Sequence, residues 1–102
     1  MATETLSMEE VRDRLKKLPR WGLEGNAIRR TIKFGGFADA VAFVARLAFD
    51  AEAADHHPDI DIRYRRVTLT YSTHSAGGLT VKDFAGAETA DRFATQLGGQ
   101  QE

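Results

Sequence analysis

Cysteine is absent from this chain, and this excludes disulfide bonds, thiolate nucleophiles and cysteine-based zinc sites. Long hydrophobic runs are also absent, since no segment approaches the roughly 20 apolar residues that a membrane-spanning helix needs. The N-terminal segment lacks the basic start and apolar run of a secretory signal. We therefore expect a soluble cytoplasmic protein that has no membrane partner.

Neither sign of charge is in marked excess. The chain carries 14 basic and 15 acidic residues, mixed along its length, which gives a formal net charge of -1. The basic residues that could form a strip across the predicted strands are Arg29, Arg30, Lys33, Arg63, Arg65 and Arg66. Exposed strand faces are often basic, however, and no whole-chain field is available to attract nucleic acid. We expect no nucleic-acid partner.

Internal repeats, low-complexity tracts and interdomain linkers are missing as well. With 102 residues, of which 42% are hydrophobic, the chain is large enough for one core, and we expect a single domain over residues 1–102. A core of this size leaves part of the sheet or helix surface to be completed by a partner. Self-association is therefore expected.

Three segments have the pattern of amphipathic helices. Ser7 and Glu10 fit a capping box, which predicts a short helix that ends near Pro19. The spacing of apolar residues from Phe37 to about Asp55 predicts a longer helix. A second capping box at Thr80 and Asp83 begins a third helix, which runs to about Leu97.

Two strand pairs separate these helices. Residues 21–24 and 27–34 flank the turn-favouring pair Gly25-Asn26, and Arg30 is the one misfit in their alternation. Residues 60–64 and 67–71 alternate around Arg65-Arg66. The order α-β-β-α-β-β-α predicts an α+β fold, in which a four-stranded antiparallel sheet carries the helices on one face.

All three histidines lie between positions 56 and 74. Imidazole is the side chain whose ordinary pKa lies nearest to neutrality, so this concentration indicates proton transfer or metal ligation. His56 and His57 precede Pro58, which disfavours helical geometry and places the pair at a helix end. His74 follows a predicted strand. We expect a cleft where the helix end and the strand end converge.

Two carboxylates are candidates to support this cleft. If helical geometry persists to His56, Glu52 lies one turn earlier on the same face and can hold the imidazole. A solvated surface contact is the alternative for that pair, and helix capping alone would explain Asp83. Gly77-Gly78 either provides the positive φ angles of a turn or permits close approach by a planar ligand. The sequence leaves these alternatives open.

Three histidines can also form a zinc site. Neighbouring residues of an extended chain project to opposite sides, however, so His56 and His57 are poorly placed to bind one metal ion together. We therefore expect no metal site.

The run from Ala51 to Asp83, AEAADHHPDIDIRYRRVTLTYSTHSAGGLTVKD, resembles the signature of the pterin-4a-carbinolamine dehydratases. That signature consists of an acidic residue, HHP, a short hairpin and then THxxxGLxxxD. The upstream segments WGLEGNAIRRTIKF and FADAVAFVARLAFDAE are also similar to the family. The resemblance thus runs from Trp21 to at least Asp83.

The resemblance implies a lyase that dehydrates 4a-hydroxytetrahydropterin to quinonoid dihydropterin, and that forms homodimers or homotetramers. It implies a role in tetrahydrobiopterin recycling beside an aromatic amino acid hydroxylase, without a cofactor. The catalytic residues that it implies are His56, His57 and His74. The substrate-binding residues that it implies are Glu52, Asp55, Pro58, Ser72, Thr73 and Asp83. We assign proton transfer to His56 and His74, and substrate binding mainly to His57.

The chain departs from the family pattern at Ile60, where an aromatic residue, usually tryptophan, follows HHP and one acid. Loss of a large flat side chain changes the packing around a pterin. The rival hypothesis is a binding protein on the same scaffold, because the family includes transcription dimerisation cofactors and carboxylase assembly chaperones. Retention of all three histidines favours catalysis, since a pure interaction module has no chemical need for them.

Overall fold

The computed structural model of the chain describes residues 4–101. Its helices are α1 (Met8–Leu15), α2 (Phe37–Ala54) and α3 (Val81–Gln96), and a 3-10 helix, η1, covers His74–Ala76. The strands are β1 (Gly22–Glu24), β2 (Ala27–Lys33), β3 (Asp59–Arg63), β4 (Arg66–Tyr71) and β5 (Gln100–Gln101). The predicted order α-β-β-α-β-β-α is confirmed.

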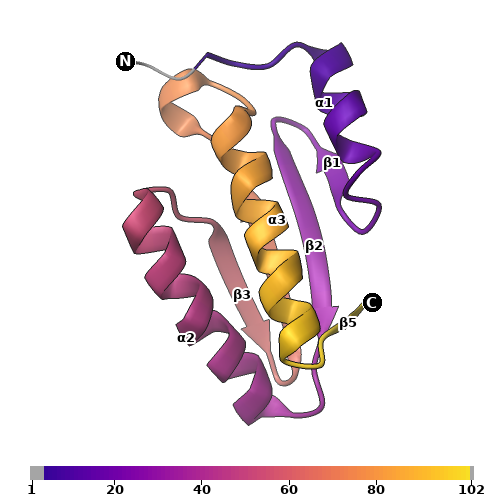
Figure 1. The fold of residues 1–102 in the computed structure, drawn as a ribbon, viewed down its shortest axis with the longest axis vertical. Helices are drawn as coiled ribbons and strands as arrows, with labels where there is room; N and C mark the ends of the chain where they lie inside the picture. Colours follow the sequence, from indigo (N-terminus) through magenta and orange to yellow (C-terminus); the bar gives the residue numbers. More distant parts are fainter. Residues whose placement is uncertain (1–3, 102) are drawn as a thin grey trace.

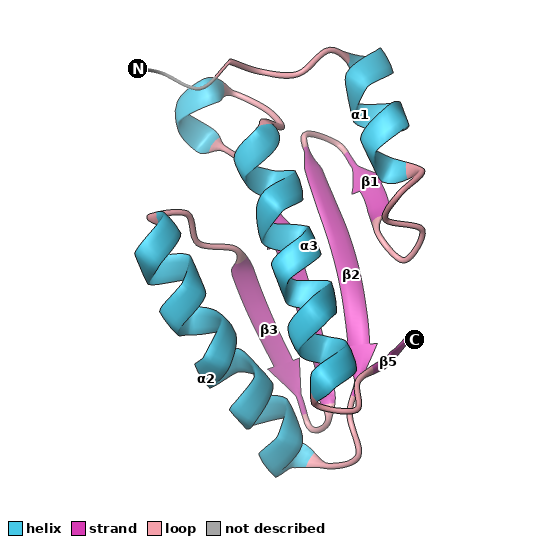
Figure 2. Cartoon of the chain, viewed as in Figure 1, coloured by secondary structure: helices cyan, strands magenta, loops and turns pink. Residues whose placement is uncertain are grey.

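The strands form an antiparallel sheet in the order β1-β2-β4-β3, and α2 and α3 lie side by side over one face of it (Figure 1). The predicted α+β fold is therefore confirmed. The strand β5 adds a short pairing to β2, at Ile32 and Lys33, which a Gln-Gln pair in the sequence does not indicate. Figure 2 shows α1 apart from the other two helices, beside β1.

The core lies between the sheet and the helices. Alternate residues of the two central strands point into it and are at most 1% exposed: Ile28, Ile32, Val67, Leu69 and Tyr71. Apolar side chains of the helices, Phe43 and Leu47 of α2 and Phe84 of α3 among them, cover this row. Burial of such large apolar side chains is the main stabilising term of the fold.

Arg30 shares the inward parity of Ile28 and Ile32, which explains why it is a misfit in the sequence. Its guanidinium is buried and donates to Asp91 Oδ1 on α3, which also accepts from Trp21 Nε1 at 2.8 Å. A buried charge needs such a partner, because desolvation of an unpaired ion is costly. The misfit therefore marks an ion pair between the sheet and α3.

The β3–β4 turn lies one residue earlier than predicted. Arg63 pairs with Arg66, so the turn consists of Tyr64 and Arg65 instead of Arg65 and Arg66. Tyr64 has a φ of 54° and is 68% exposed, although it continues the alternation of Ile60 and Ile62. The sequence pattern predicted the wrong turn because the apolar alternation continues to Tyr64, one residue past Arg63, the last residue of β3 that pairs with β4.

None of the helices in residues 4–101 is both long and apolar enough to cross a membrane. That includes α2, the longest helix.

Candidate active site

His56 is positioned by the end of α2. Asp55 adopts a left-handed conformation (φ 51°) directly after the last helical residue, Ala54. The chain then reverses, and the His56 N–H donates to Ala51 O at 3.1 Å, a bond typical of helices that end in a left-handed residue. Pro58, which is buried, prevents any continuation of the helix. His56 is thereby turned towards the core, and its side chain is only 12% exposed.

Asp83 lies at the centre of the site and is completely buried. Its Oδ1 contacts His56 Nε2 at 2.6 Å, and its Oδ2 accepts from Thr73 Oγ1 at 2.7 Å and from the Thr80 N–H at 2.9 Å. Thr80 Oγ1 lies 2.8 Å from Thr73 Oγ1 and completes the cluster. Asp83 therefore caps α3 and also holds His56, so both interpretations of the sequence apply to it.

The proton arrangement in this cluster follows from its chemistry. A carboxylate in its ionised form only accepts hydrogen bonds, so with Asp83 in that form His56 would donate from Nε2 and leave Nδ1 free to accept a proton. A buried carboxylate that accepts three bonds also stabilises positive charge on the imidazole beside it. Such an arrangement has the chemistry to transfer a proton from a fixed orientation.

His57 projects away from this cluster. Its Nε2 contacts Glu52 Oε1, and about half of the His57 side chain and most of the Glu52 side chain are exposed. The sequence suggested that Glu52 could hold His56 if the helix persisted. That pairing was wrong, because the left-handed Asp55 ends the helix and turns His56 to Asp83. Glu52 instead orients His57.

His74 is exposed in η1, directly after Thr73. The loop is closed by bonds between the backbones of Thr73 and Gly78, and Gly77 provides a left-handed φ of 73°. Because Thr73 donates to Asp83, the chain at His74 is tied to the same carboxylate that holds His56. The helix end and the strand end thus meet through Asp83, although His74 and His56 line different hollows.

The remaining predicted site residues lie around this centre. Ser72 and Thr73 line the same hollow as His74, together with Asn26 and Gly78. Asp55 is exposed at the end of α2. Ile60, at the position where the family pattern has an aromatic residue, lies opposite Leu69 on the edge strand β3 and is 39% exposed.

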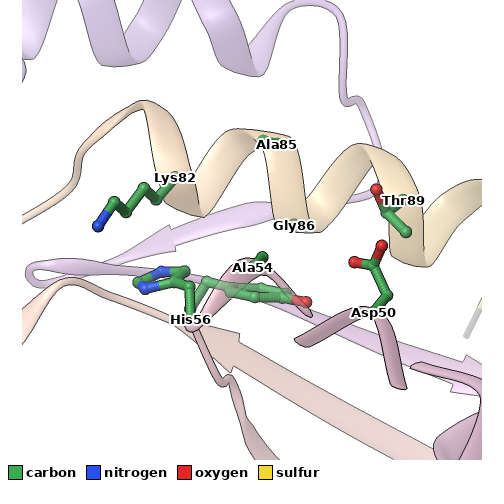
Figure 3. A pocket seen from close by; sticks show the side chains of 8 residues that line it. Asp50, Ala54, His56, Lys82, Ala85, Gly86 and Thr89 are labelled. Atoms are coloured by element: carbon green, nitrogen blue, oxygen red, sulfur yellow. The ribbon is translucent and has the colours of Figure 1, made fainter. Parts of the chain in front are cut away.

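A pocket of about 200 Å³ lies on the other side of His56, between α2 and α3. Figure 3 shows His56 and Lys82 at one end of it and Asp50 and Thr89 at the other. The Tyr71 ring, 6.0 Å from the His56 ring between centroids, also lines it. Burial, together with the nearby charges of Asp50 and Asp83, holds the pKa of the Tyr71 phenol well above its usual value, so the hydroxyl stays protonated.

Sequence reasoning missed Thr80 and this pocket. The capping box predicted a bond within α3, but not that Thr80 would also contact Thr73. A glycine inside a helix, Gly86, was the available signal for the pocket, because such a residue usually has a packing reason. Within residues 4–101 no group of three or more His, Asp or Glu side chains is arranged to hold a metal ion.

The fold and this site define a small α+β protein in which a buried carboxylate holds a histidine. Side chains of these two types are suited to acid–base chemistry. The family model described as "Pterin 4 alpha carbinolamine dehydratase" matches residues 4–93. The chain belongs to this family of hydro-lyases. The resemblance inferred from the sequence is confirmed.

Relatives agree with this assignment over most of their length. A protein of Chloroflexus aurantiacus, provisionally named pterin-4-alpha-carbinolamine dehydratase, is 56% identical over 88 residues, which cover 86% of this chain and 95% of the relative. A protein of Roseiflexus sp. with the same provisional name is 55% identical over 93 residues, 91% of this chain and 99% of the relative.

Solved structures agree in fold. A crystal structure described as a transcriptional coactivator/pterin dehydratase from Brucella melitensis superposes with a TM-score of 0.86 at 36% identity, and covers 89% of this chain and 99% of that chain. A pterin dehydratase-like protein described as a RuBisCO assembly factor in the alpha-carboxysome gives a TM-score of 0.60 at 25% identity, over 74% of this chain and 87% of that chain.

Proposed function

We propose that the protein dehydrates 4a-hydroxytetrahydropterin to quinonoid dihydropterin by histidine acid–base catalysis. The observation that carries the proposal is the contact of His56 with the buried Asp83 at 2.6 Å, in a chain that belongs to the dehydratase family. A buried carboxylate that fixes one histidine, beside two exposed histidines, supports chemistry better than it supports passive binding.

The reaction requires two proton transfers. The bond from C4a to its hydroxyl oxygen breaks, and an acid protonates the leaving hydroxide to give water. A base removes the proton from N5, and the N–H electron pair forms the N5=C4a double bond. Imidazoles do both near neutral pH, and each such transfer contributes on the order of 10² to 10⁴-fold.

We assign these transfers to His56 and His74, and substrate binding mainly to His57. The fixed orientation of His56 on Asp83 suits a proton-transfer group, while the exposed position of His57 on Glu52 suits a contact with the ligand. The substrate would lie along the end of β4, where Ser72 and Thr73 border the hollow at His74. Asp55 and Pro58 complete the site as the segment that positions the two adjacent histidines.

We also propose that the reaction serves tetrahydrobiopterin recycling for an aromatic amino acid hydroxylase, and that the chain forms a homodimer or homotetramer. Apolar side chains on the outer face of α2 support self-association, since Phe37 is 55% and Phe49 is 79% exposed. The open edge of β3 is a second surface for pairing. Light scattering measures the stoichiometry, and a monomer at all concentrations would contradict this part.

The alternative function is that of a binding protein on the same scaffold. Two solved structures with this fold are described as a transcriptional coactivator/pterin dehydratase and as a RuBisCO assembly factor, and the apolar face of α2 could bind a protein partner. Recovery of a stoichiometric protein partner, together with no acceleration of dehydration by the folded protein, would favour this alternative.

The test of the proposal is a comparison of three single variants with the wild-type protein. Dehydration of freshly generated 4a-hydroxytetrahydropterin is followed by absorbance, and circular dichroism confirms the fold of each variant. We expect His56→Gln and His74→Ala to lose most of the rate, about 10²-fold or more, and His57→Gln to raise KM more than it lowers kcat. Full activity of His74→Ala would remove His74 from the mechanism.

A further inference from the structure

The pocket beside His56 exists because the helices that flank it carry small residues. Ala54 of α2 and Ala85 of α3 line it, and Gly86 lies against the phenol ring of Tyr71. A Cβ at position 86 would lie 2.5 Å from Tyr71 Cε1 and 3.0 Å from the hydroxyl oxygen, closer than such contacts allow. The glycine therefore permits the tyrosine hydroxyl to reach the pocket between the helices.

Three polar groups that line this pocket have no hydrogen-bond or ion-pair partner among the described residues. Across residues 4–101, neither the Tyr71 hydroxyl, the Thr89 hydroxyl nor the Asp50 carboxylate makes a hydrogen bond or ion pair to another residue. Tyr71 as a whole is only 1% exposed, but its hydroxyl is not among the buried side-chain atoms that lack a partner, so it opens into the pocket, where an entering group can bond to it. These groups are placed to bind something that enters the pocket.

Their chemistry defines the class of ligand. The protonated phenol donates, the threonine hydroxyl both donates and accepts, and the carboxylate accepts. The walls between them are apolar and small. This combination, with the opposite charges of Asp50 and Lys82 at the two ends of the pocket, fits a short, uncharged chain that carries hydroxyl groups.

Substrate chemistry links the pocket to the histidine. Elimination requires removal of the N5 proton, and C6 of the pterin is bonded to N5. The first atom of a substituent on C6 is therefore two bonds from N5, at which a catalytic histidine acts. His56 borders the pocket, so a C6 side chain can enter the pocket beside it.

We propose that Tyr71, Thr89 and Asp50 form a subsite that binds a hydroxylated side chain on C6 of the pterin substrate. This inference rests on the proposed function, since it takes His56 as a group that acts at the reacting atoms. The subsite confers a preference for pterins with hydroxyl groups in the side chain over pterins with a methyl group.

The experiment compares kcat/KM for two 4a-hydroxytetrahydropterins that carry either a 6-(1,2-dihydroxypropyl) or a 6-methyl group. Thr89→Val removes one hydroxyl, and Ala85→Leu fills the pocket from an exposed position on α3. The matched controls are Thr95→Val on the same helix and Ala42→Leu on the exposed face of α2. We expect the two subsite variants to reduce the ratio of the two kcat/KM values about tenfold, and the controls to leave it unchanged.

A general loss of structure would lower both kcat/KM values together and leave their ratio unchanged, so the ratio isolates the subsite. A wild-type protein without preference, or an unchanged ratio in both subsite variants, would overturn the subsite while leaving the proposed function intact. Equilibrium titration with the unreactive 7,8-dihydropterins that carry the same two groups provides a second readout. If the protein binds the two dihydropterins with different affinities but dehydrates neither substrate, the proposed function is contradicted and the subsite is not. If the protein binds neither dihydropterin, both the subsite and the proposed function are overturned.

Discussion

At the scale of single residues, Asp83 joins structure and chemistry. It caps α3, accepts from Thr73 at the end of β4 and holds His56 at the end of α2. Three segments that are distant in the sequence therefore meet at one carboxylate. A substitution there acts on the orientation of the histidine as well as on the helix end.

Asp83→Asn removes the charge and one acceptor from this cluster. We expect the dehydration rate to fall about tenfold or more, because the imidazole loses both its fixed orientation and the stabilisation of its positive charge. We expect a stability loss of about 1 kcal/mol from the weakened cap. Steady-state kinetics and thermal unfolding measure the two effects.

The chain offers its own control for this variant. Glu10 occupies the same capping-box position in α1, where it is exposed and its carboxylate accepts from the Ser7 N–H instead of holding a histidine. Glu10→Gln weakens a cap without touching the site, so its activity should match that of the wild-type protein. Equal activity losses in Asp83→Asn and Glu10→Gln would show that the effect on activity comes through folding.

Tyr71 makes the stability of the protein dependent on pH in the alkaline range. The raised pKa keeps its phenol protonated in the folded state, while the unfolded state ionises above about pH 10. The folded state then binds more protons, so stability falls as pH rises past that value. Between about pH 9 and pH 11, we expect the free energy of unfolding of Tyr71→Phe to fall by about 1 kcal/mol less than that of the wild-type protein. Urea unfolding measures both free energies. Identical pH slopes in the two proteins would refute this.

At the scale of elements, the end of α2 decides how the histidines are placed. Asp55 carries the left-handed conformation that turns His56 inward, and this conformation is costly for residues other than glycine. The same residue is also a predicted substrate contact, so its two roles can be separated by substitution.

Asp55→Gly keeps the backbone geometry and removes the carboxylate. We expect the free energy of unfolding to stay equal or to rise by up to about 1 kcal/mol, because glycine adopts this conformation without strain. If Asp55 contacts the substrate, KM rises while kcat changes little. Denaturant unfolding and steady-state kinetics measure both, and an unchanged KM would remove Asp55 from the binding residues.

The sequence predicted the elements well because each depends on local patterns. Capping boxes at Ser7 and Thr80 marked helix starts, and alternation in β2 and β4 identified the inward residues. The pairing of His56 with Asp83 could not be derived from spacing, because it depends on the left-handed turn at Asp55. The pocket at Tyr71 was equally hidden, since it is formed by the packing of two helices and a strand.

At the scale of the whole molecule, a second, partly buried cluster connects the sheet to α3. Arg30 of β2 and Trp21 both donate to Asp91, and Arg30 is 3% exposed. This cluster holds the C-terminal half of α3 on the sheet, while the Asp83 cluster holds its beginning. The position of α3, and with it the pocket beside His56, depends on both ends.

Asp91→Asn leaves the buried guanidinium of Arg30 without its counter-charge. We expect the free energy of unfolding to fall by about 3 kcal/mol, since removal of one partner from a buried ion pair is strongly destabilising. Asp61→Asn, at an exposed pair with Arg63, provides the comparison and should change stability by less than about 0.5 kcal/mol. Similar losses in the two variants would contradict a structural role for the buried pair.

The most direct measurement is the rate at which freshly generated 4a-hydroxytetrahydropterin loses water in the presence of the wild-type protein, compared with the same concentration of a folded variant that lacks all three histidines. We expect the wild-type protein to accelerate the dehydration by at least about 10²-fold over the triple variant. Equal rates with the two proteins, or a wild-type rate no faster than that of buffer, would contradict histidine catalysis at this site.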